Sequence, residues 1–309
     1  MGSDSADIGI IGSGLVATRV AAIMSARGIR ARMATHLNAT ELLEQKTVVL
    51  AHGGRHASLA STFLSHGINV VSCNDNMADV LSMLDLQERA VAHGAVVVPG
   101  AACMPGLSGL LVAHAARAFD HVEEAHLAMH GTGGPACARN HHEALAGTSV
   151  GWHDSEWLQR PAGSGRELCW FPDPFGPRDC YRFGTAEPVL LQRILPSLQR
   201  ITARVSATRR DRLTARLPMM SPPHAEGGVG GLRVELRGTR QGARHDEVVG
   251  IADRLATVAG AVAAETALVV NAGGIAPGVQ ILGSDGLPNA DLLDAVLANG
   301  VSLHRYVGG

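Results

Sequence analysis

The sequence predicts an α/β protein: a Rossmann-type parallel sheet followed by a second α+β domain built on an antiparallel sheet. Three observations support this. Short apolar runs alternate with Ala-rich helical segments up to about residue 120, a glycine-rich turn follows the first run, and the alternation then stops. Repeated strand–helix units build parallel sheets with helices on both faces, whereas strands without intervening helices favour antiparallel pairing.

The composition is that of a packed globular chain. Hydrophobic residues make up 46% of the 309 positions, charged residues 17%, and the formal net charge is −2. This excludes a disordered chain and provides no basic field for nucleic acid or an anionic membrane. Lys46 is the only lysine, which nearly excludes Schiff-base chemistry. We expect a small-molecule substrate as partner, with no nucleic acid and no membrane.

Neither the cysteines nor the apolar tracts indicate secretion or membrane insertion. The five cysteines are odd in number and contain no C-x-x-C pair, so neither a disulfide framework nor a zinc site is predicted. No basic region followed by an apolar run opens the chain. The tract 255–272 is interrupted by Glu265 and falls short of the ~20 apolar residues that span a bilayer, so we expect a packed helix and a cytoplasmic protein.

The first strand, turn and helix form the strongest motif. Residues 7–11 are an apolar run, G-x-G-x-x-A follows at 12–17, and 18–27 is helical in composition. Gly12 permits the tight turn and Gly14 lets the backbone approach a pyrophosphate, which lies at the helix N-terminus where free N–H groups favour an anion. The cofactor-binding residues predicted from this loop are Gly12, Ser13, Gly14, Leu15 and Val16.

The alternation continues to residue 99. Apolar and β-branched runs predict strands, and longer Ala- and Leu-rich runs predict helices. Strands are expected at 29–35, 47–51, 69–72 and 95–99, and helices at 38–45, 57–66 and 79–93. Because the second strand–helix unit is short, we predict a trimmed Rossmann domain.

The second half differs in composition. Seven of the ten aromatic residues fall between Trp152 and Phe183. The domain prediction is a dinucleotide-binding domain at 1–120, completed by 251–309, and a substrate and dimerisation domain at 121–250. Strands are expected at 125–130, 198–208, 212–217 and 231–238, and a helix at 252–270. An apolar, aromatic-rich sheet face needs covering, so we expect a homodimer.

Three later segments share a further likeness. They are VVVPGAACMPGLS at 96–108, GINVVSCND at 67–75, and the helix and turn at 257–278. Together they resemble the saccharopine dehydrogenase-like (saccharopine reductase-type) family. The resemblance implies a Rossmann domain, a second α+β domain completed by the C-terminus, NAD(P)-dependent redox chemistry and often a dimer. Met104 stands where the family has Asp, which argues against amino-acid recognition of the saccharopine type.

Ligands of open α/β sheets lie beyond the carboxyl ends of the strands. His52 and Gly53 follow the third strand, where the nicotinamide ribose passes, although a solvated loop histidine is an alternative. Asn74 and Asp75 follow the fourth strand and are candidates to bind the nicotinamide amide or the substrate, although both types also favour turns. Cys103 fits a small buried hydrophobe better than a nucleophile.

A second cluster surrounds the Gly-rich loop at 131–134. His130, Arg139, His141 and His142 offer a proton donor and a charge clamp, unless they only face solvent at a helix N-terminus. Reduction of C=O or C=N requires protonation of the heteroatom, and histidine suits this near neutral pH. Neighbouring side chains diverge on a helix, so we predict no metal site. The predicted catalytic residues are Asp75, His130, Arg139 and His141.

The end of the second strand bears on cofactor choice. An NAD site places an acid there to bind the ribose 2′-hydroxyl, but Thr35, His36 and Leu37 occupy the region. Arg30 and Arg32 are available to bind a 2′-phosphate. We therefore predict NADP, with NAD as the alternative, and add Thr35, Arg32, His52, Gly53 and Asn74 to the cofactor-binding residues.

The leading functional hypothesis is an NAD(P)-dependent oxidoreductase, a reductase transferring hydride to a small carbonyl, imine or activated alkene. A homoserine- or dihydrodipicolinate-type reductase shares the two-domain plan, but the latter needs a lysine-bearing active-site motif and Lys46 is wrongly placed. A non-catalytic NAD(P)-sensing regulatory protein is the alternative from another class. Cofactor oxidation with a candidate substrate separates the two classes.

Overall fold

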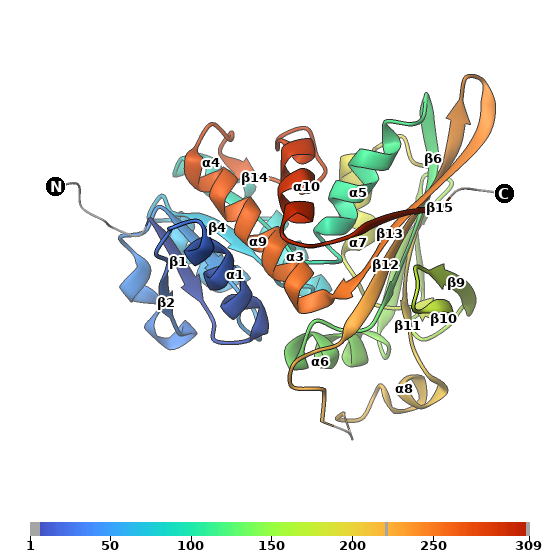
Figure 1. Ribbon diagram of the computed structural model, residues 1–309, viewed down its shortest axis with the longest axis horizontal. Helices are drawn as coiled ribbons and strands as arrows, with labels where there is room; N and C mark the ends of the chain where they lie inside the picture. The colour runs from blue at the N-terminus through green and yellow to red at the C-terminus, as the bar shows by residue number, and fades with distance from the viewer. Residues whose placement is uncertain (1–6, 220–221, 307–309) are drawn as a thin grey trace.

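The computed structural model describes residues 7–219 and 222–306 as two sheets with helices packed between and around them (Figure 1). The first sheet is wholly parallel, in the order β14-β5-β4-β3-β1-β2. Its strands are β1 (Ile8–Ile11), β2 (Arg32–Ala34), β3 (Thr47–Leu50), β4 (Asn69–Ser72), β5 (Val96–Val98) and β14 (Gly278–Val279). The predicted α/β fold with a Rossmann-type sheet is confirmed.

Both faces of this sheet are covered, which explains its continuous apolar strands. Val49 and Val71 point into one core cluster, while their neighbours Val48 and Val70 point into another, as the period of two requires. One face carries α1 (Leu15–Ala26) and α9 (Leu255–Ala272), and the other carries α2 (Ala57–Leu64), α3 (Met77–Leu84) and α4 (Gln87–Ala92). The predicted helix at 79–93 is thus two helices, and the one at 38–45 is the 3₁₀ segment His36–Leu42.

The second sheet has nine strands, in the order β15-β13-β12-β6-β11-β10-β9, with β7 and β8 paired beside β11. They are β6 (His121–His130), β7 (Thr148–His153), β8 (Glu156–Pro161), β9 (Glu167–Phe171), β10 (Gly176–Arg182), β11 (Arg200–Ser206), β12 (Val229–Arg240), β13 (Ala243–Arg254) and β15 (Leu303–Tyr306). The sheet is mixed, because β11 runs parallel to β6. Between them the chain passes through α6 (Pro135–Ala144) and α7 (Glu187–Ile194), a crossover long enough to restore the strand direction.

One predicted strand, at 212–217, is wrong: residues Arg209–Thr214 form helix α8. Thr208 starts this helix with a capping box, in which its Oγ1 accepts from the Asp211 N–H while the Asp211 carboxylate accepts from the Thr208 N–H. A capping box satisfies two backbone donors at a helix N-terminus. This local chemistry outweighs the weak alternation of the segment.

The C-terminal segment 251–309, expected to complete the first domain, contributes to both sheets. Helix α9 and β14 join the first sheet, whereas β15 pairs with β13 in the second. The helix predicted from residue 252 begins at Leu255, because β13 extends to Arg254 and leads directly into it. The long pairing of β12 with β13 accounts for this later start.

A single hydrophobic core connects the two sheets. It runs from the α1 face of the first sheet through α9 and α5 (Leu107–Ala116) to the inner face of the second, with α10 (Asn289–Ala298) packed on α5 and α9 (Figure 1). Among the described residues, Leu255–Ala272 is the one helix long and apolar enough to cross a membrane, and 72% of it is buried within the protein.

A buried carboxylate ties three helices together. Glu265, on α9, is 2% exposed, and its two oxygens accept from Arg27 at the end of α1 at 2.7 and 2.5 Å. The same carboxylate accepts from Asn299 Nδ2, at the end of α10, at 2.7 Å. A charge buried in this way requires such partners.

We expect Arg27→Ala to lower the free energy of unfolding by about 3 kcal/mol, because it leaves the Glu265 carboxylate buried without its counter-charge. This expected loss lies at the low end of the range for broken buried ion pairs, because the Arg27 side chain is 41% exposed. Urea denaturation measures it. Glu265→Gln in the Arg27→Ala background should recover most of the loss. No recovery would show that Arg27 acts through packing rather than charge.

Candidate active site

A cavity of about 580 Å³ lies between the two domains, at the carboxyl ends of the first sheet's strands. This is a common place and size for a small-molecule site. Strand β1 sits between β2 and β3, so the chain reverses its order of strand addition at this point. The predicted residues that line the cavity are Gly12, Ser13, Gly14, Leu15, Val16, Thr35, His52, Gly53, Asn74, Asp75 and Arg139.

The glycine-rich loop has the geometry of an anion cradle. Gly12 has φ +140°, and a Cβ there would lie 2.2 Å from the Ala51 carbonyl oxygen, so no other residue fits. Gly14 precedes the first turn of α1, which carries no acidic residue, and a Cβ at Gly14 would meet nothing within 4 Å. The loop therefore presents the N-terminus of α1 to open space, as a pyrophosphate needs.

The end of the cavity beyond β2 is bounded by Thr35, His36 and Leu37, with His36 stacked on His52 at 5.7 Å between ring centroids. Arg32, the remaining predicted cofactor-binding residue, does not line the cavity. Its guanidinium lies 3.7 Å from the Glu41 carboxylate, with both side chains about half exposed. The prediction for Arg32 did not consider Glu41 as a partner of the guanidinium, with which a 2′-phosphate would compete.

Asn74 lines the cavity, but its amide is engaged inside the protein. Nδ2 donates to the Gly54 carbonyl at 3.0 Å and to Asp79 at 2.6 Å, and Oδ1 accepts from the Asn76 N–H. The Asp79 carboxylate also accepts from the His56 N–H at 2.8 Å. Asn74 therefore holds the loops after β3 and β4 together.

His56 packs against His52 behind the cavity wall, with 4.3 Å between the ring centroids. Its Nδ1 contacts Ser72 Oγ at 2.8 Å and its Nε2 contacts the His52 carbonyl oxygen at 3.0 Å. Burial, reinforced by His52, lowers the pKa of His56 to about 4, and burial also lowers the pKa of His52. Both rings are thus uncharged at neutral pH and add no positive charge to this side of the cavity.

The predicted catalytic residue Asp75 is the centre of a polar cluster. His141 Nε2 lies 3.4 Å from Asp75 Oδ2, and Asn140 Nδ2 donates to Asp75 Oδ1 at 2.6 Å. Cys137 Sγ lies 3.6 Å from the same His141 nitrogen. Asp75 follows β4, whereas the other three residues lie on α6, so the cluster joins the two domains.

This cluster favours the charged form of the Asp75–His141 pair, a carboxylate and an imidazolium, over the neutral form. Burial by itself raises the pKa of the Asp75 carboxyl, but the bonds from His141, Asn140 and Cys137 outweigh it and lower that pKa below its usual value. Burial opposes protonation of His141, yet Cys137 and Asp75 together raise its pKa well above the usual value. The cavity thus presents an ionised carboxylate backed by an imidazolium.

His141 stands behind the cavity wall rather than in it. Its ring packs edge-on against Phe183, and its Nδ1 is buried without a hydrogen-bond partner among the described residues. It acts on the cavity through Asp75 and Cys137, both of which line it. His141 is therefore a positioning residue. The neighbouring His142 points away and contacts the carbonyls of Thr214 and Leu217, as divergence on a helix predicts.

His130, the fourth predicted catalytic residue, does not line this cavity. Its Nδ1 contacts Ser206 Oγ at 2.7 Å, and its ring packs against Phe171 and Phe175. Successive side chains of a strand point to opposite faces, so Met129 of β6 reaches the cavity while His130 faces the other side of the second sheet.

Two members of the cluster, Cys137 and Asn140, were not predicted. Cys137 and His141 are four residues apart on one helix, a spacing that places side chains together, so the pattern was present in the sequence. Asn140 has no such signal, because its partner Asp75 is 65 residues away.

The cluster also has the composition of a metal site. One ligand atom each from Asp75, Cys137 and His141 lie within 4.8 Å of one another. The contacts of 3.4 and 3.6 Å to His141 Nε2 are those of a direct ion pair and a sulfur hydrogen bond. We interpret the cluster as a hydrogen-bonded acid–base group.

Comparisons with known proteins find a similar fold among solved structures but no protein of similar sequence. No family model matches the sequence, and no curated protein matches it. Among solved structures, saccharopine dehydrogenase (L-Glu forming) from Saccharomyces cerevisiae aligns over 97% of this chain and 99% of its own, with 13% identity and a TM-score of 0.64. A meso-dapdh mutant with DAP from Clostridium tetani aligns over 92% and 95%, with 13% identity and a TM-score of 0.53.

The DAP dehydrogenase of C. glutamicum, solved in complex with DAP, aligns over 94% of this chain and 98% of its own, with 12% identity and a TM-score of 0.53. These likenesses span nearly the whole of both chains, so they concern both sheets and the junction between them. The chain has the two-domain fold of these dehydrogenases, as the saccharopine dehydrogenase-like segments of the sequence predicted.

Proposed function

We propose that this protein is an NAD(P)-dependent oxidoreductase that reduces a small carbonyl or imine, with an oxo or imino acid as the best-fitting substrate class. One observation supports this above all: the glycine-rich loop and the Asp75 cluster line the same cavity. The fold likeness to saccharopine and DAP dehydrogenases supports it.

The residues present suit a dinucleotide. The loop from Gly12 to Val16 would hold the pyrophosphate at the start of α1, and His52 and Gly53 would border the ribose that leads toward Asp75. When bound, NAD(P)H supplies the hydride, and the protein must position the acceptor carbon and protonate its heteroatom.

The Asp75 cluster can perform the protonation. His141 Nε2 holds a proton beside the Asp75 carboxylate, which lines the cavity and can pass it to a substrate nitrogen or oxygen. An ionised carboxylate also favours a positively charged iminium carbon over a neutral one. Arg139 lines the same cavity and offers a guanidinium for a substrate carboxylate.

The test of this function is oxidation of NAD(P)H, followed at 340 nm, with a panel of 2-oxo acids in the presence and absence of ammonium or primary amines. Gly14→Asp should abolish turnover and weaken cofactor binding at least about a hundredfold, because its carboxylate would face the pyrophosphate. The variant should fold, since the position is open and Asp is a favoured helix N-cap.

Gly14→Asn is the matched control, because it adds a side chain of the same size without charge, and it should weaken binding much less. Unchanged cofactor affinity in a folded Gly14→Asp variant would contradict the proposed site. Cofactor binding by wild type with no turnover on any substrate would instead favour the NAD(P)-sensing alternative.

The Asp75–His141 pair predicts a pH-dependent stability. Asp75 has a lowered pKa, so its contribution is present above the unfolded value of ~3.9 and is lost as the pH falls. His141 has a raised pKa, so its contribution is present below the unfolded value of ~6.5 and is lost as the pH rises through the folded value. Both are present together between about pH 4 and 6.5.

We therefore expect His141→Gln to lower the free energy of unfolding by about 2 kcal/mol near pH 5.5 and by less at pH 9, measured by urea denaturation. His66→Gln, which changes an exposed histidine in the turn after α2, should show no such pH dependence. An equal loss at both pH values would mean that His141 acts by packing alone. In activity assays His141→Gln should also shift the acid limb of the pH–rate profile to higher pH, because Asp75 loses a group that lowers its pKa.

We further propose that NADP(H) binds more tightly than NAD(H), supported by the absence of an acid among the residues from Thr35 to Leu37 that line the cavity. Because the Arg32–Glu41 pair is half exposed and weak, Arg32 can turn to a 2′-phosphate. Arg32→Ala should reduce the preference by about three- to tenfold, and Glu41→Gln should increase it. Titration of both cofactors decides this, and equal affinities or tighter NAD(H) binding would contradict it.

A further inference from the structure

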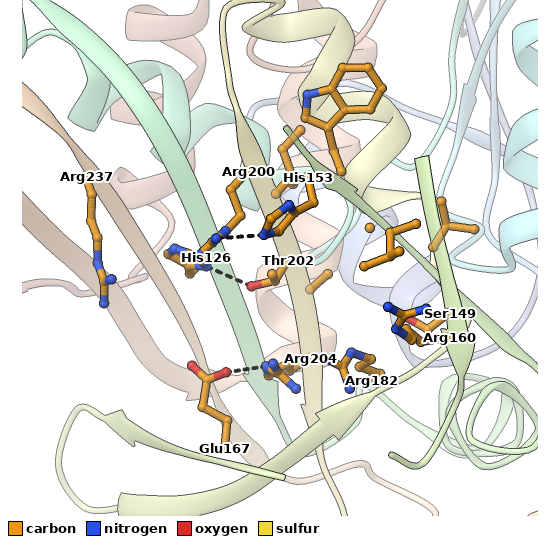
Figure 2. Close-up of a pocket in the computed structure, with 16 residues that line it drawn as sticks. His126, Ser149, His153, Arg160, Glu167, Arg182, Arg200, Thr202, Arg204 and Arg237 are labelled. Atoms are coloured by element: carbon orange, nitrogen blue, oxygen red, sulfur yellow. Dashed lines mark hydrogen bonds and ion pairs between the residues drawn. The ribbon is translucent and has the colours of Figure 1, made fainter. Parts of the chain in front are cut away.

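A second cavity, of about 390 Å³, lies on the outer face of the second sheet (Figure 2). On β11, Arg200, Thr202 and Arg204 line it, while the neighbouring Val205 is buried in the core on the other side. The cavity at the glycine-rich loop and this one thus lie on opposite faces of the sheet. The arginines that line this outer cavity are Arg160, Arg182, Arg200, Arg204 and Arg237.

Three of these arginines have carboxylate partners. Arg204 Nε lies 2.6 Å from Glu167, which is the one acidic residue among the described residues that line the outer cavity. Arg237 is paired with Glu235 at 2.6 Å, and Glu124 lies 3.8 Å from both Arg237 and Arg200. Their charges are largely compensated within the sheet.

Arg160 and Arg182 differ from the others. In the part of the chain that the structure describes, neither forms an ion pair: Arg182 donates to Ser164 Oγ at 3.5 Å and Arg160 to the Gln159 carbonyl at 3.4 Å. Burial, together with the charges of Arg204 and Arg160, lowers the pKa of Arg182. Figure 2 shows Arg160 beside Ser149, with Arg182 between them and Arg204. Three guanidiniums thus share this end of the outer cavity with one carboxylate.

We propose that this end of the outer cavity binds a small multivalent oxyanion, a phosphate group or a polycarboxylate, between Arg160, Arg182 and Arg204. Guanidinium groups bind such anions through paired, charge-assisted hydrogen bonds. The positive charge is concentrated in a cavity rather than spread along a groove, which suits a small ligand rather than a nucleic acid. Binding would relieve the repulsion that Arg182 experiences in the unliganded protein.

Isothermal titration calorimetry with inorganic phosphate and with citrate, at constant ionic strength, tests the proposal. Wild type should bind at least one of them, and tighter phosphate or tighter citrate binding identifies the phosphate group or the polycarboxylate as the preferred chemistry. The Arg160→Gln/Arg182→Gln variant should bind at least about tenfold more weakly. Arg160→Gln alone should weaken binding in the same direction, and it is safe for folding because Arg160 is exposed on β8.

Arg244→Gln, which changes an exposed arginine on β13 outside the outer cavity, is the matched control and should bind as wild type does. Phosphate can also bind at the glycine-rich loop, so Gly14→Asp is included. Binding that survives Gly14→Asp and weakens in the arginine variants supports the proposal. Binding lost in Gly14→Asp and unchanged in the arginine variants overturns it.

The proposal is also overturned if these arginines serve in dimerisation of the chain instead of anion binding. If wild type binds neither anion and is a dimer by light scattering, and Arg160→Gln/Arg182→Gln is a monomer, then these arginines pair with carboxylates of a second copy of the chain.

Discussion

The close approach of α1 and α9 is the constraint on which the rest of the structure depends. At Gly260 a Cβ would lie 2.5 Å from the Arg19 Cβ, so the two helices pack as closely as they do only because that position has no side chain. Helix α9 continues directly from β13, and its packing on the first sheet therefore fixes the second sheet in place. Leu15, at the start of α1, and Leu255, at the start of α9, both line the cavity at the glycine-rich loop, so the width of this cavity follows from the same contact.

Charge is distributed so that the two faces of the second sheet differ. Toward the first domain, the uncharged His52 and His56 and the ionised Asp75 leave the site with a carboxylate among mostly apolar walls. On the outer face, arginines exceed carboxylates at one end of a polar cavity. On β6 the alternation of the strand places Met129 at the first cavity and His126 at the outer one, so the same strand borders both without bringing their charged groups together.

The candidate site depends on contacts between segments that are distant in the sequence. Asp75 ends a strand of the first domain, and its partners Asn140 and His141 lie on a helix of the second. Separation of the two domains would leave the Asp75 carboxylate without the groups that lower its pKa. The ionisation state of the site and the relative position of the domains are therefore linked. The buried Glu265 likewise depends on partners distant in the sequence, because Arg27 and Asn299 are 238 and 34 residues away from it.

The sequence by itself determined the parallel sheet, the glycine-rich loop and the part of the cavity wall that follows the strand ends, because apolar periodicity and turn chemistry act over a few residues. Gly12, Gly14, His52 and Asp75 could be placed by the rule that ligands lie beyond strand ends. Only the tertiary structure decided which face of β6 meets the cavity, which turned His130 to the other side of the second sheet, and which partners lie beside Arg32 and Asp75. It also decided that β11 joins β6 in parallel and that β15 belongs to the second sheet. These outcomes depend on pairing between remote segments, whose energies are set by burial and complementary charge rather than by any local pattern.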